Sequence, residues 1–230
     1  MNKLVVITGG SSGIGESLVL VFSKAGYEVV SIDIKKPRYE ISGVNYIQAD
    51  ITSYEQMELI AKTFSGVDVL INNAAVQFVS PLLNVKNEDI KSTIDVNILG
   101  TINVTKAFAL QMHDSLVINV GSVHSTLPRK NKIAYDMSKA AMNIFTKEIA
   151  LELAPKNIRS ICVEFGAVDT PMNKEFDENE EIKNEAIDKQ VIKHLLSSEE
   201  CAQAILGLTK DEFKYLNGAI IKYDCGRSIK

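Results

Sequence analysis

The sequence contains few of the residues that build disulfide-stabilised or zinc-binding proteins. It has three cysteines and three histidines among 230 residues. Cys162, Cys201 and Cys225 are odd in number, widely separated and without Cys-x-x-Cys spacing. This pattern argues against a disulfide framework and against a zinc site. We therefore expect small buried apolar residues at these positions, and no metal.

The sequence also lacks an excess of basic residues and any long hydrophobic run. Its formal net charge is -4 and its pI is about 5.5, so it offers no basic surface to polyanions, and nucleic-acid binding is disfavoured. The apolar run near the start has four residues, too few for a signal peptide or a membrane span. These absences predict a cytoplasmic protein with neither nucleic-acid nor membrane partners.

No internal repeat, linker or low-complexity tract divides the chain. Apolar residues at 46% and charged residues at 23% are ordinary for a globular protein, and the length suits one domain. We expect a single α/β domain over residues 1–230.

A glycine-rich turn follows the first apolar run. Residues 3–7 read as a buried strand, Thr8-Gly9-Gly10-Ser11-Ser12-Gly13-Ile14-Gly15 follows, and a helical pattern continues through Lys24. A strand, a glycine turn and a helix in this order are typical of a dinucleotide-binding unit. Glycines permit close backbone approach, and the free N–H groups at the helix start suit a pyrophosphate.

The second predicted strand, residues 27–32, ends at Asp33, 18 residues beyond Gly15. An acidic residue near this spacing binds the adenosine ribose hydroxyls, and its carboxylate would repel a 2′-phosphate. Asp33 therefore predicts NAD rather than NADP, although a merely solvated aspartate remains open. A nearby basic cluster could still accept a phosphate: Lys35, Lys36 and Arg38.

Further strands and helices alternate along the chain. Strands are predicted at residues 44–48, 68–71, 116–120, 158–163 and 219–223, and helices at 52–64, 87–112, 135–153 and from Ser197. This alternation indicates a Rossmann-type, doubly wound, seven-stranded parallel sheet with helices on both faces. Capping boxes are expected at Ser53/Gln56 and Ser197/Glu200. The four-residue row of Ile90, Ile94, Ile98 and Ile102 predicts a helix face turned toward the sheet, with Asn97 off that row.

A serine, a tyrosine and a lysine form the strongest chemical signal. Ser122 follows the strand at 116–120, where ligands bind in open parallel sheets. Tyr135 and Lys139 stand four residues apart, so on a helix the ammonium lies near the phenol and lowers its pKa. Taken alone, such a pair is usually an ordinary surface pair.

Two segments near this signal carry unassigned charge. The loop at 123–132 contains His124, Arg129, Lys130 and Lys132. Residues 171–196 are irregular and rich in acidic residues. Such a run is commonly a solvated surface, but its place after a strand's carboxyl end makes it a candidate lid over a site.

These motifs together resemble the short-chain dehydrogenase/reductase family over essentially the whole chain. The matching residues are Thr8-Gly9-x-x-x-Gly13-x-Gly15, Asp50, Asn72-Asn73-Ala74, Asn97, Ser122 and Tyr135-x-x-x-Lys139. The resemblance implies that Tyr135 is the catalytic acid/base and that Ser122 binds the reacting oxygen. It implies that Lys139 lowers the Tyr135 pKa and binds the nicotinamide ribose, and that Asn97 holds a relay water.

The resemblance also implies a cofactor site and an assembly. The implied cofactor contacts are Gly9, Ser12, Gly13, Ile14, Gly15, Asp33, Asp50, Ile51, Asn73, Ala74, Tyr135, Lys139, Val168 and Thr170. NADP-dependent members usually carry a basic residue where this chain has Ser12 or Ile34, which supports NAD. Related proteins are usually homodimers or homotetramers built through the helices at 87–112 and 135–153.

The substrate is less well defined. Residues 121–124 and 166–173 look like the corresponding stretches of bacterial glucose and polyol dehydrogenases, and the candidate substrate contacts are Gln77, His124 and Phe165. Three residues depart from the family's usual pattern. Phe165 changes the expected path of the nicotinamide wall, Ala75 narrows the floor of the site, and Cys225 bears on subunit contact more than on catalysis. We expect hydride transfer between NAD(H) and a secondary alcohol or ketone, such as a sugar or polyol. The alternatives are a 3-oxoacyl-type reductase using NADP(H) and a non-catalytic dinucleotide-binding regulator.

Overall fold

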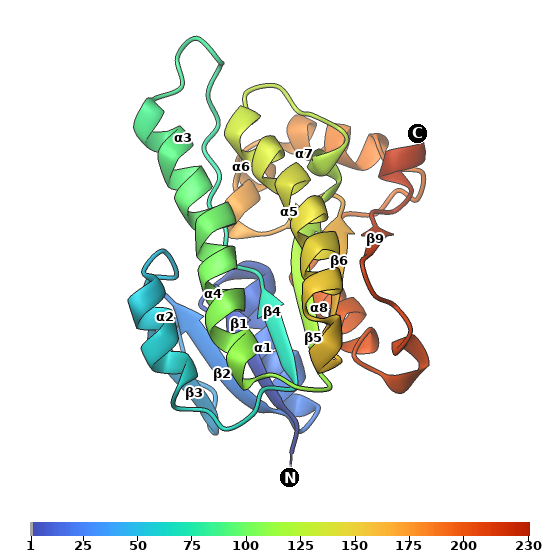
Figure 1. Cartoon of the computed structure of the whole chain (residues 1–230). Coiled ribbons are helices and arrows are strands. Elements are labelled where there is room, and N and C mark those ends of the chain that lie inside the picture. Colours follow the sequence, from blue (N-terminus) through green and yellow to red (C-terminus); the bar gives the residue numbers. More distant parts are fainter. Residues whose placement is uncertain (1) are drawn as a thin grey trace.

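Seven parallel strands form one sheet in the computed structural model, which describes residues 2–230 (Figure 1). Their order is β3-β2-β1-β4-β5-β6-β9, as the doubly wound prediction requires. The chain therefore winds outward from β1 on one side and from β4 on the other, so the order reverses between these two strands. The strands are β1 (Leu4–Thr8), β2 (Glu28–Asp33), β3 (Val44–Gln48), β4 (Val69–Asn72), β5 (Leu116–Ser122), β6 (Arg159–Phe165) and β9 (Ala219–Tyr223).

Helices cover both faces of this sheet (Figure 1). One layer consists of α1 (Gly13–Lys24) and α8 (Ser198–Gly207), and the other of α2 (Tyr54–Ala61), α4 (Thr101–Phe108) and α5 (Ile133–Glu152). Successive strand residues point to opposite faces. Val5 and Ile7 of β1 pack in the α1/α8 core, while Leu4 and Val6 pack in the other core. The apolar strand runs are thus buried on both sides, as a parallel sheet requires.

The predicted orientation of the isoleucine row is wrong. A continuous helical stretch joins α3 (Asn87–Ile94), a π-helical segment (Asp95–Gly100) and α4. Ile94 and Ile102 are 38% and 37% exposed, whereas Asn97 is fully buried. The inward face carries small and polar side chains because the helix approaches closely: a Cβ on Gly100 would lie 2.7 Å from Ile51. Periodicity identified an apolar stripe but could not decide which stripe is turned inward.

One of the two predicted capping boxes is incomplete. Ser53 accepts a hydrogen bond from the Gln56 backbone, but the Gln56 side chain accepts from Asp50 rather than returning to Ser53. The Asp50 backbone N–H therefore donates to the Gln56 side chain, as the Ser53 backbone N–H would in a complete capping box. At the start of α8, Ser197 and Glu200 form both bonds of the motif.

The acidic segment after β6 is more regular than expected. The short strands β7 (Val168–Asp169) and β8 (Leu196–Ser197) pair with each other. Between them lie the 3-10 turn Pro171–Asn173 and the helices α6 (Glu175–Glu178) and α7 (Glu180–Asp188). Figure 1 shows α6 and α7 at the end of the molecule where the C-terminus lies.

The burial of the cysteines and the hydropathy of the helices are ordinary for a globular domain. Cys162 and Cys201 are buried, Cys225 is partly buried, and all three are free thiols. No helix within residues 2–230 combines the length and hydropathy that a membrane span needs. Over the same residues, no group of three or more histidine, cysteine or acidic side chains is placed to hold a metal ion.

Candidate active site

A large cavity opens at the carboxyl ends of the central strands. Its volume of about 1360 Å³ exceeds the range of about 300–1,000 Å³ usual for a single small ligand. Two predicted residues, Gly15 and Asn97, are not part of its lining. The predicted residues that do line it are Gly9, Ser12, Gly13, Ile14, Asp33, Asp50, Ile51, Asn73, Ala74, Gln77, Ser122, His124, Tyr135, Lys139, Phe165, Val168 and Thr170.

The glycine turn after β1 forms one wall. Gly9 and Gly13 have φ values of +71° and +57°, a conformation that glycine adopts without strain. Gly15 lies behind the turn, where a Cβ would stand 1.9 Å from the Gly9 carbonyl oxygen. Gly15 therefore shapes the site by letting α1 pack against the turn, although it does not face the cavity.

The start of α1 suits a pyrophosphate group. Ser12 is the N-cap residue, and its side chain makes no capping hydrogen bond. The first N–H groups of a twelve-residue helix thus have no side-chain cap and lie at the positive end of the helix dipole. Such an end attracts a negatively charged ligand, and Ser12, Gly13 and Ile14 border the cavity there.

Asn73 fixes the shape of the glycine turn. Its Nδ2 donates to the carbonyl oxygens of Thr8 and Gly9 at 3.0 and 3.2 Å. The Thr8 hydroxyl oxygen in turn accepts from the backbone N–H groups of Asn73 and Ala74, both at 3.1 Å. Asn72, the other asparagine of the motif, instead donates to side chains within the buried core. Only Asn73 therefore links the ends of β1 and β4 by side-chain to backbone bonds.

Backbone N–H groups orient the two predicted cofactor carboxylates. Asp33 accepts from the backbone of Ser11 at 3.0 Å and from that of Lys35 at 2.9 Å. Asp50 accepts from the Thr52 backbone and hydroxyl, both at 2.9 Å. Of the basic cluster near Asp33, Lys35 lines the cavity, while Lys36 and Arg38 are exposed outside its lining.

The opposite wall is built by the start of α5 and the end of β5. Tyr135, Lys139 and Ser122 are 8%, 5% and 6% exposed and all face the cavity. Lys139 Nζ donates to the Val120 carbonyl oxygen at 2.7 Å and lies 5.6 Å from the Tyr135 ring centroid. The expected one-turn separation of phenol and ammonium is therefore present.

The expected lowering of the Tyr135 pKa is wrong for this structure. Burial raises the Tyr135 pKa to about 12, opposed by a hydrogen bond with the Ser122 side chain. Burial likewise lowers the Lys139 pKa to about 8. Removal of water penalises the charged form of each group, and it is the largest cause of both pKa shifts. The phenol is consequently protonated at neutral pH.

Asn97 lies buried within the π-helical segment and bonds to Val76, which lines the cavity. Its Oδ1 accepts from Val76 N at 2.8 Å, and its Nδ2 donates to Val76 O and to the Ser138 hydroxyl, both at 3.0 Å. The side chain thus joins the segment after β4 to α5, the helix that carries Tyr135. Asn97 contributes to the position of the catalytic wall.

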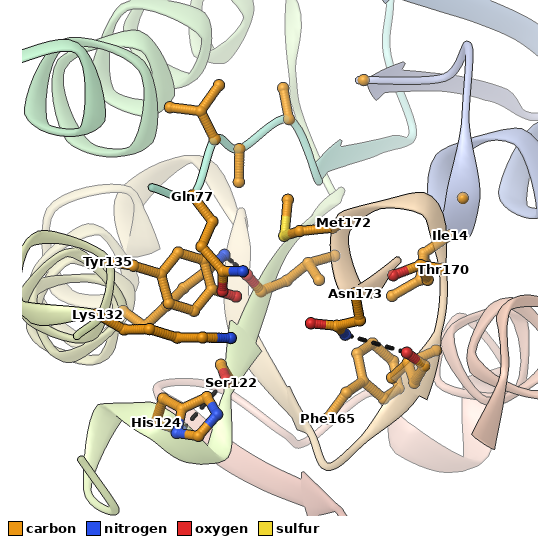
Figure 2. A pocket seen from close by; sticks show the side chains of 18 of the residues that line it. Ile14, Gln77, Ser122, His124, Lys132, Tyr135, Phe165, Thr170, Met172 and Asn173 are labelled. Carbon is orange, nitrogen blue, oxygen red and sulfur yellow. Dashed lines mark hydrogen bonds between the residues drawn. The ribbon is translucent and has the colours of Figure 1, made fainter. Parts of the chain in front are cut away.

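Polar side chains converge on the remaining part of the cavity. Figure 2 shows Gln77, His124 and Asn173 pointing into it, beside the apolar Phe165 and Met172. Burial lowers the His124 pKa, so the ring is neutral at pH 7. His124 Nδ1 is 2.8 Å from the Leu127 carbonyl oxygen, which fixes the proton on Nδ1 and leaves Nε2 as an acceptor.

Sequence analysis missed the role of Lys132, which it treated only as one basic residue of a loop. Lys132 is 2% exposed and lines the cavity. The available signal was its position: Lys132 precedes Tyr135 by three residues and is the N-cap residue of α5, and both side chains line the cavity. By contrast, Arg129 forms an ion pair with Glu175 at 3.0 Å.

Comparisons with known proteins agree with this geometry. The family model described as short chain dehydrogenase matches residues 3–181. A 3-oxoacyl-(acyl-carrier-protein) reductase of Thermotoga maritima is 32% identical over 243 residues, covering 99% of this chain and 98% of that protein.

Solved structures of similar proteins share the whole fold. The ligand-free aldohexose dehydrogenase of Thermoplasma acidophilum has a TM-score of 0.92 and 27% identity, covering 100% of this chain and 95% of that one. The 3-ketoacyl-(acyl-carrier-protein) reductase of Brucella melitensis, complexed with NADH, has a TM-score of 0.87 and 26% identity, covering 98% of each chain. The chain therefore belongs to the short-chain dehydrogenase/reductase family, whose members are NAD(P)-dependent oxidoreductases acting on CH–OH groups.

Proposed function

We propose that this protein transfers a hydride between NAD(H) and a small secondary alcohol or its ketone. The observation that carries this proposal is one cavity lined both by the glycine turn and by Ser122, Tyr135 and Lys139. A dinucleotide wall and an acid/base wall thus face each other across a space large enough for cofactor and substrate. The comparison with aldohexose dehydrogenase supports a sugar or polyol as one substrate class.

Tyr135 is the proposed acid/base. With its pKa near 12 the phenol is protonated, which is the state that gives a proton to a ketone oxygen during reduction. In oxidation the phenolate takes the alcohol proton, and the Lys139 ammonium favours that ionised form. Ser122 donates a hydrogen bond to the reacting oxygen. The bound nicotinamide supplies the hydride or accepts it.

Asn97 and Lys139 are proposed to assist Tyr135 without exchanging a proton with the substrate themselves. Both side-chain N–H donors of Asn97 already bond to Val76 and Ser138, and its Oδ1 accepts one bond. We propose that Asn97 holds the backbone around a relay water near Lys139, and that Lys139 also bonds the nicotinamide ribose.

The remaining predicted residues are the proposed cofactor contacts. Ser12, Gly13 and Ile14 would bind the pyrophosphate, and Asp33 the adenosine ribose. The other proposed cofactor contacts that line the cavity are Gly9, Asp50, Ile51, Asn73, Ala74, Val168 and Thr170. Gly15 supports the turn from behind.

We propose NAD rather than NADP as the preferred dinucleotide. Two backbone N–H groups hold the Asp33 carboxylate at the carboxyl end of β2, where it would repel a 2′-phosphate. Lys36 and Arg38 are exposed outside the cavity lining, so Lys35 is the basic residue of that cluster best placed to oppose this preference.

The segment at 171–196 is the proposed lid. Met172, Asn173 and Glu175 line the cavity, and the Arg129–Glu175 ion pair connects this segment to the loop at 123–132. A lid in this position would exclude water from the reacting atoms.

A 3-oxoacyl reductase acting on an acyl carrier protein is the second candidate, favoured by the Thermotoga relative. Acyl carrier proteins would need an exposed basic surface near the cavity. Here Arg129 is paired with Glu175 and Lys132 is buried, while acidic residues dominate α6 and α7. These features favour a free small molecule. A regulator without turnover is the least supported reading because the serine, tyrosine and lysine are all present.

We propose a homodimer or homotetramer built through the helical stretch at 87–112, which contains α3, the π-helical segment and α4, and through α5. Large apolar side chains are exposed on these helices, including Met137 at 62%, Ile144 at 59% and Leu151 at 74%. Such a face is typical of an interaction surface. A single species of 25 kDa in light scattering would contradict an oligomer.

Turnover of a substrate panel tests the proposed activity. NADH absorbance would be followed with sugars, polyols, hydroxy acids and simple alcohols, using the wild type and Tyr135→Phe. We expect Tyr135→Phe to lose about 10²–10⁴-fold in turnover because the proton donor is gone, while fluorescence titration shows retained NADH binding.

Tyr215→Phe is the matched control, because Tyr215 is 88% exposed and outside the cavity lining. It should leave turnover unchanged. Full activity in Tyr135→Phe would refute the assigned mechanism.

A further inference from the structure

Lys132 is a buried positive charge that the proposed hydride transfer does not use. It occupies the N-cap position of α5 and is only 2% exposed. Within residues 2–230, its Nζ has no hydrogen bond within 3.5 Å and no ion pair within 4.0 Å. An unpaired ammonium is costly to remove from water, so its position in the cavity wall favours an anionic group bound in the cavity.

The acidic groups near Lys132 contact Arg129 rather than Lys132, and Asp136 Oδ1 is buried without a hydrogen-bond partner. Asp136 accepts a hydrogen bond from Arg129 N at 2.8 Å, and Glu175 pairs with the Arg129 guanidinium at 3.0 Å. Burial lowers the Lys132 pKa to about 8, with Arg129 lowering it further and Glu175 and Asp136 opposing. Lys132 therefore remains mostly protonated at neutral pH without direct neutralisation by a protein carboxylate.

The direction of the Lys132 side chain places its charge on the substrate side. Figure 2 shows it extending into the cavity, in this view between Tyr135 and Ser122, with His124 on the same side. Ile14 and Thr170, which belong to the cofactor wall, lie across the cavity. A pyrophosphate at the start of α1 is thus not the natural partner of this ammonium.

We infer that Lys132 binds the carboxylate of the substrate, so that the substrates are short hydroxy acids and the corresponding oxo acids. Lys132 is the N-cap residue three positions before Tyr135, and Figure 2 shows both side chains in the same part of the cavity, so the carboxylate would lie close to the carbon whose oxygen contacts Tyr135. This proximity fits a hydroxyl on the second or third carbon of the acid. The inference rests on the proposed oxidoreductase function and narrows its substrate class.

Matched four-carbon substrates test this inference. 2-Hydroxybutanoate and 3-hydroxybutanoate carry the anion, and 2-butanol has the same chain without it. We expect wild-type kcat/KM for at least one acid to exceed that for 2-butanol by about tenfold or more. A hydrogen bond to a charged group is worth about 1.5–3 kcal/mol, so Lys132→Met should reduce the acid-to-alcohol ratio about 10- to 100-fold, mainly through KM.

Two further variants separate charge at Lys132 from a general effect of net charge. Lys132→Arg keeps the positive charge and should retain most of the acid preference. Lys147→Met removes an exposed lysine from the same helix, outside the cavity lining, and should leave the ratio at its wild-type value. Equal ratios in wild type and Lys132→Met would overturn the inference, as would a wild-type preference for 2-butanol or sugars over both acids.

An unreactive acid provides a measurement that does not depend on Lys132→Met folding. Butanoate should inhibit 2-butanol oxidation by the wild type competitively, whereas butanamide should not. Equal effects of the two would overturn the inference. If no alcohol or hydroxy acid is turned over, the proposed function fails. Calorimetry of butanoate binding in the presence of NADH then tests the inference separately. Binding to the wild type but not to Lys132→Met supports the inference, and equal or absent binding refutes it.

Discussion

The two helical layers differ at their outer surfaces. None of the large apolar residues of α1 and α8 is exposed, whereas the opposite layer of α2, α4 and α5, together with α3 and the π-helical segment, exposes several. These are Leu59, Ile94, Leu99, Ile102, Ile133, Met137, Ile144 and Leu151. The α1/α8 layer therefore exposes no large apolar side chain to water, while the opposite layer has an apolar outer face, through which we propose that the chain assembles.

The same two layers contribute to the cavity in different ways. The start of α1 supplies backbone groups, and its packing depends on the lack of a side chain at Gly15. The opposite layer supplies buried side chains, with Tyr135 and Lys139 held by α5 and α5 connected to the π-helical segment through Asn97 and Ser138. We therefore expect the wall formed by the glycine turn and α1 to be disturbed by an added side-chain atom. We expect the wall formed by β5 and α5 to be disturbed by the loss of a buried side chain.

Adding a methyl group at Gly15 should have the largest effect of the structural changes. The new Cβ in Gly15→Ala would stand 1.9 Å from the Gly9 carbonyl oxygen, so the turn must shift. Overpacking costs about 1–3 kcal/mol or more, and we expect the melting temperature to fall by about 5 °C. NADH affinity, measured by fluorescence titration, should fall at least about tenfold.

Gly207→Ala is the matched control within the same layer. Gly207 ends α8, and a Cβ there meets nothing within 4 Å. Because alanine favours helix over glycine, stability should be unchanged or slightly higher. Equal responses of the two variants would show that the close packing of α1 on the turn does not matter.

A charge on the apolar face should break the assembly. Ile144→Asp places a carboxylate on α5, where the wild-type side chain is 59% exposed, and we expect a smaller molar mass in light scattering. Burying an unpaired carboxylate in an interface costs several kcal/mol. Ile192→Asp, at a 64% exposed position outside these helices, should leave the mass unchanged. The same loss of mass in both variants would contradict an interface through α5.

Neutralising Asp33 should have the smallest of these effects. It tests whether this carboxylate sets the preference for NADH over NADPH. Asp33→Asn removes the charge that would repel a 2′-phosphate, so the ratio of NADPH to NADH affinity should rise at least about tenfold in parallel titrations. Asp211→Asn, on an exposed turn, should not change this ratio. Tighter wild-type binding of NADPH than of NADH would instead show that Lys35 outweighs Asp33.

Much of the fold could be predicted because its signals are local. The glycine turn, the seven apolar strand runs and the Ser197/Glu200 capping box each depend on neighbouring residues, and the structure has all of them. The isoleucine row was misread because an apolar stripe fits equally well against a sheet or against another protein. The cap of α2 was misread because Asp50, outside the helix, supplies the competing N–H group.

The sequence by itself determined the order of the strands along the chain and the identity of the residues that meet at their carboxyl ends. Motif spacing was sufficient for this, since parallel strands bring those ends to one edge of the sheet. Only the tertiary structure decided how strongly each group is removed from water. Burial raises the pKa of Tyr135 rather than lowering it, and the fold buries Lys132 in the same cavity wall, without an ion pair to any carboxylate of residues 2–230. Solvation depends on every element packed around a side chain, which residue spacing along the chain does not specify.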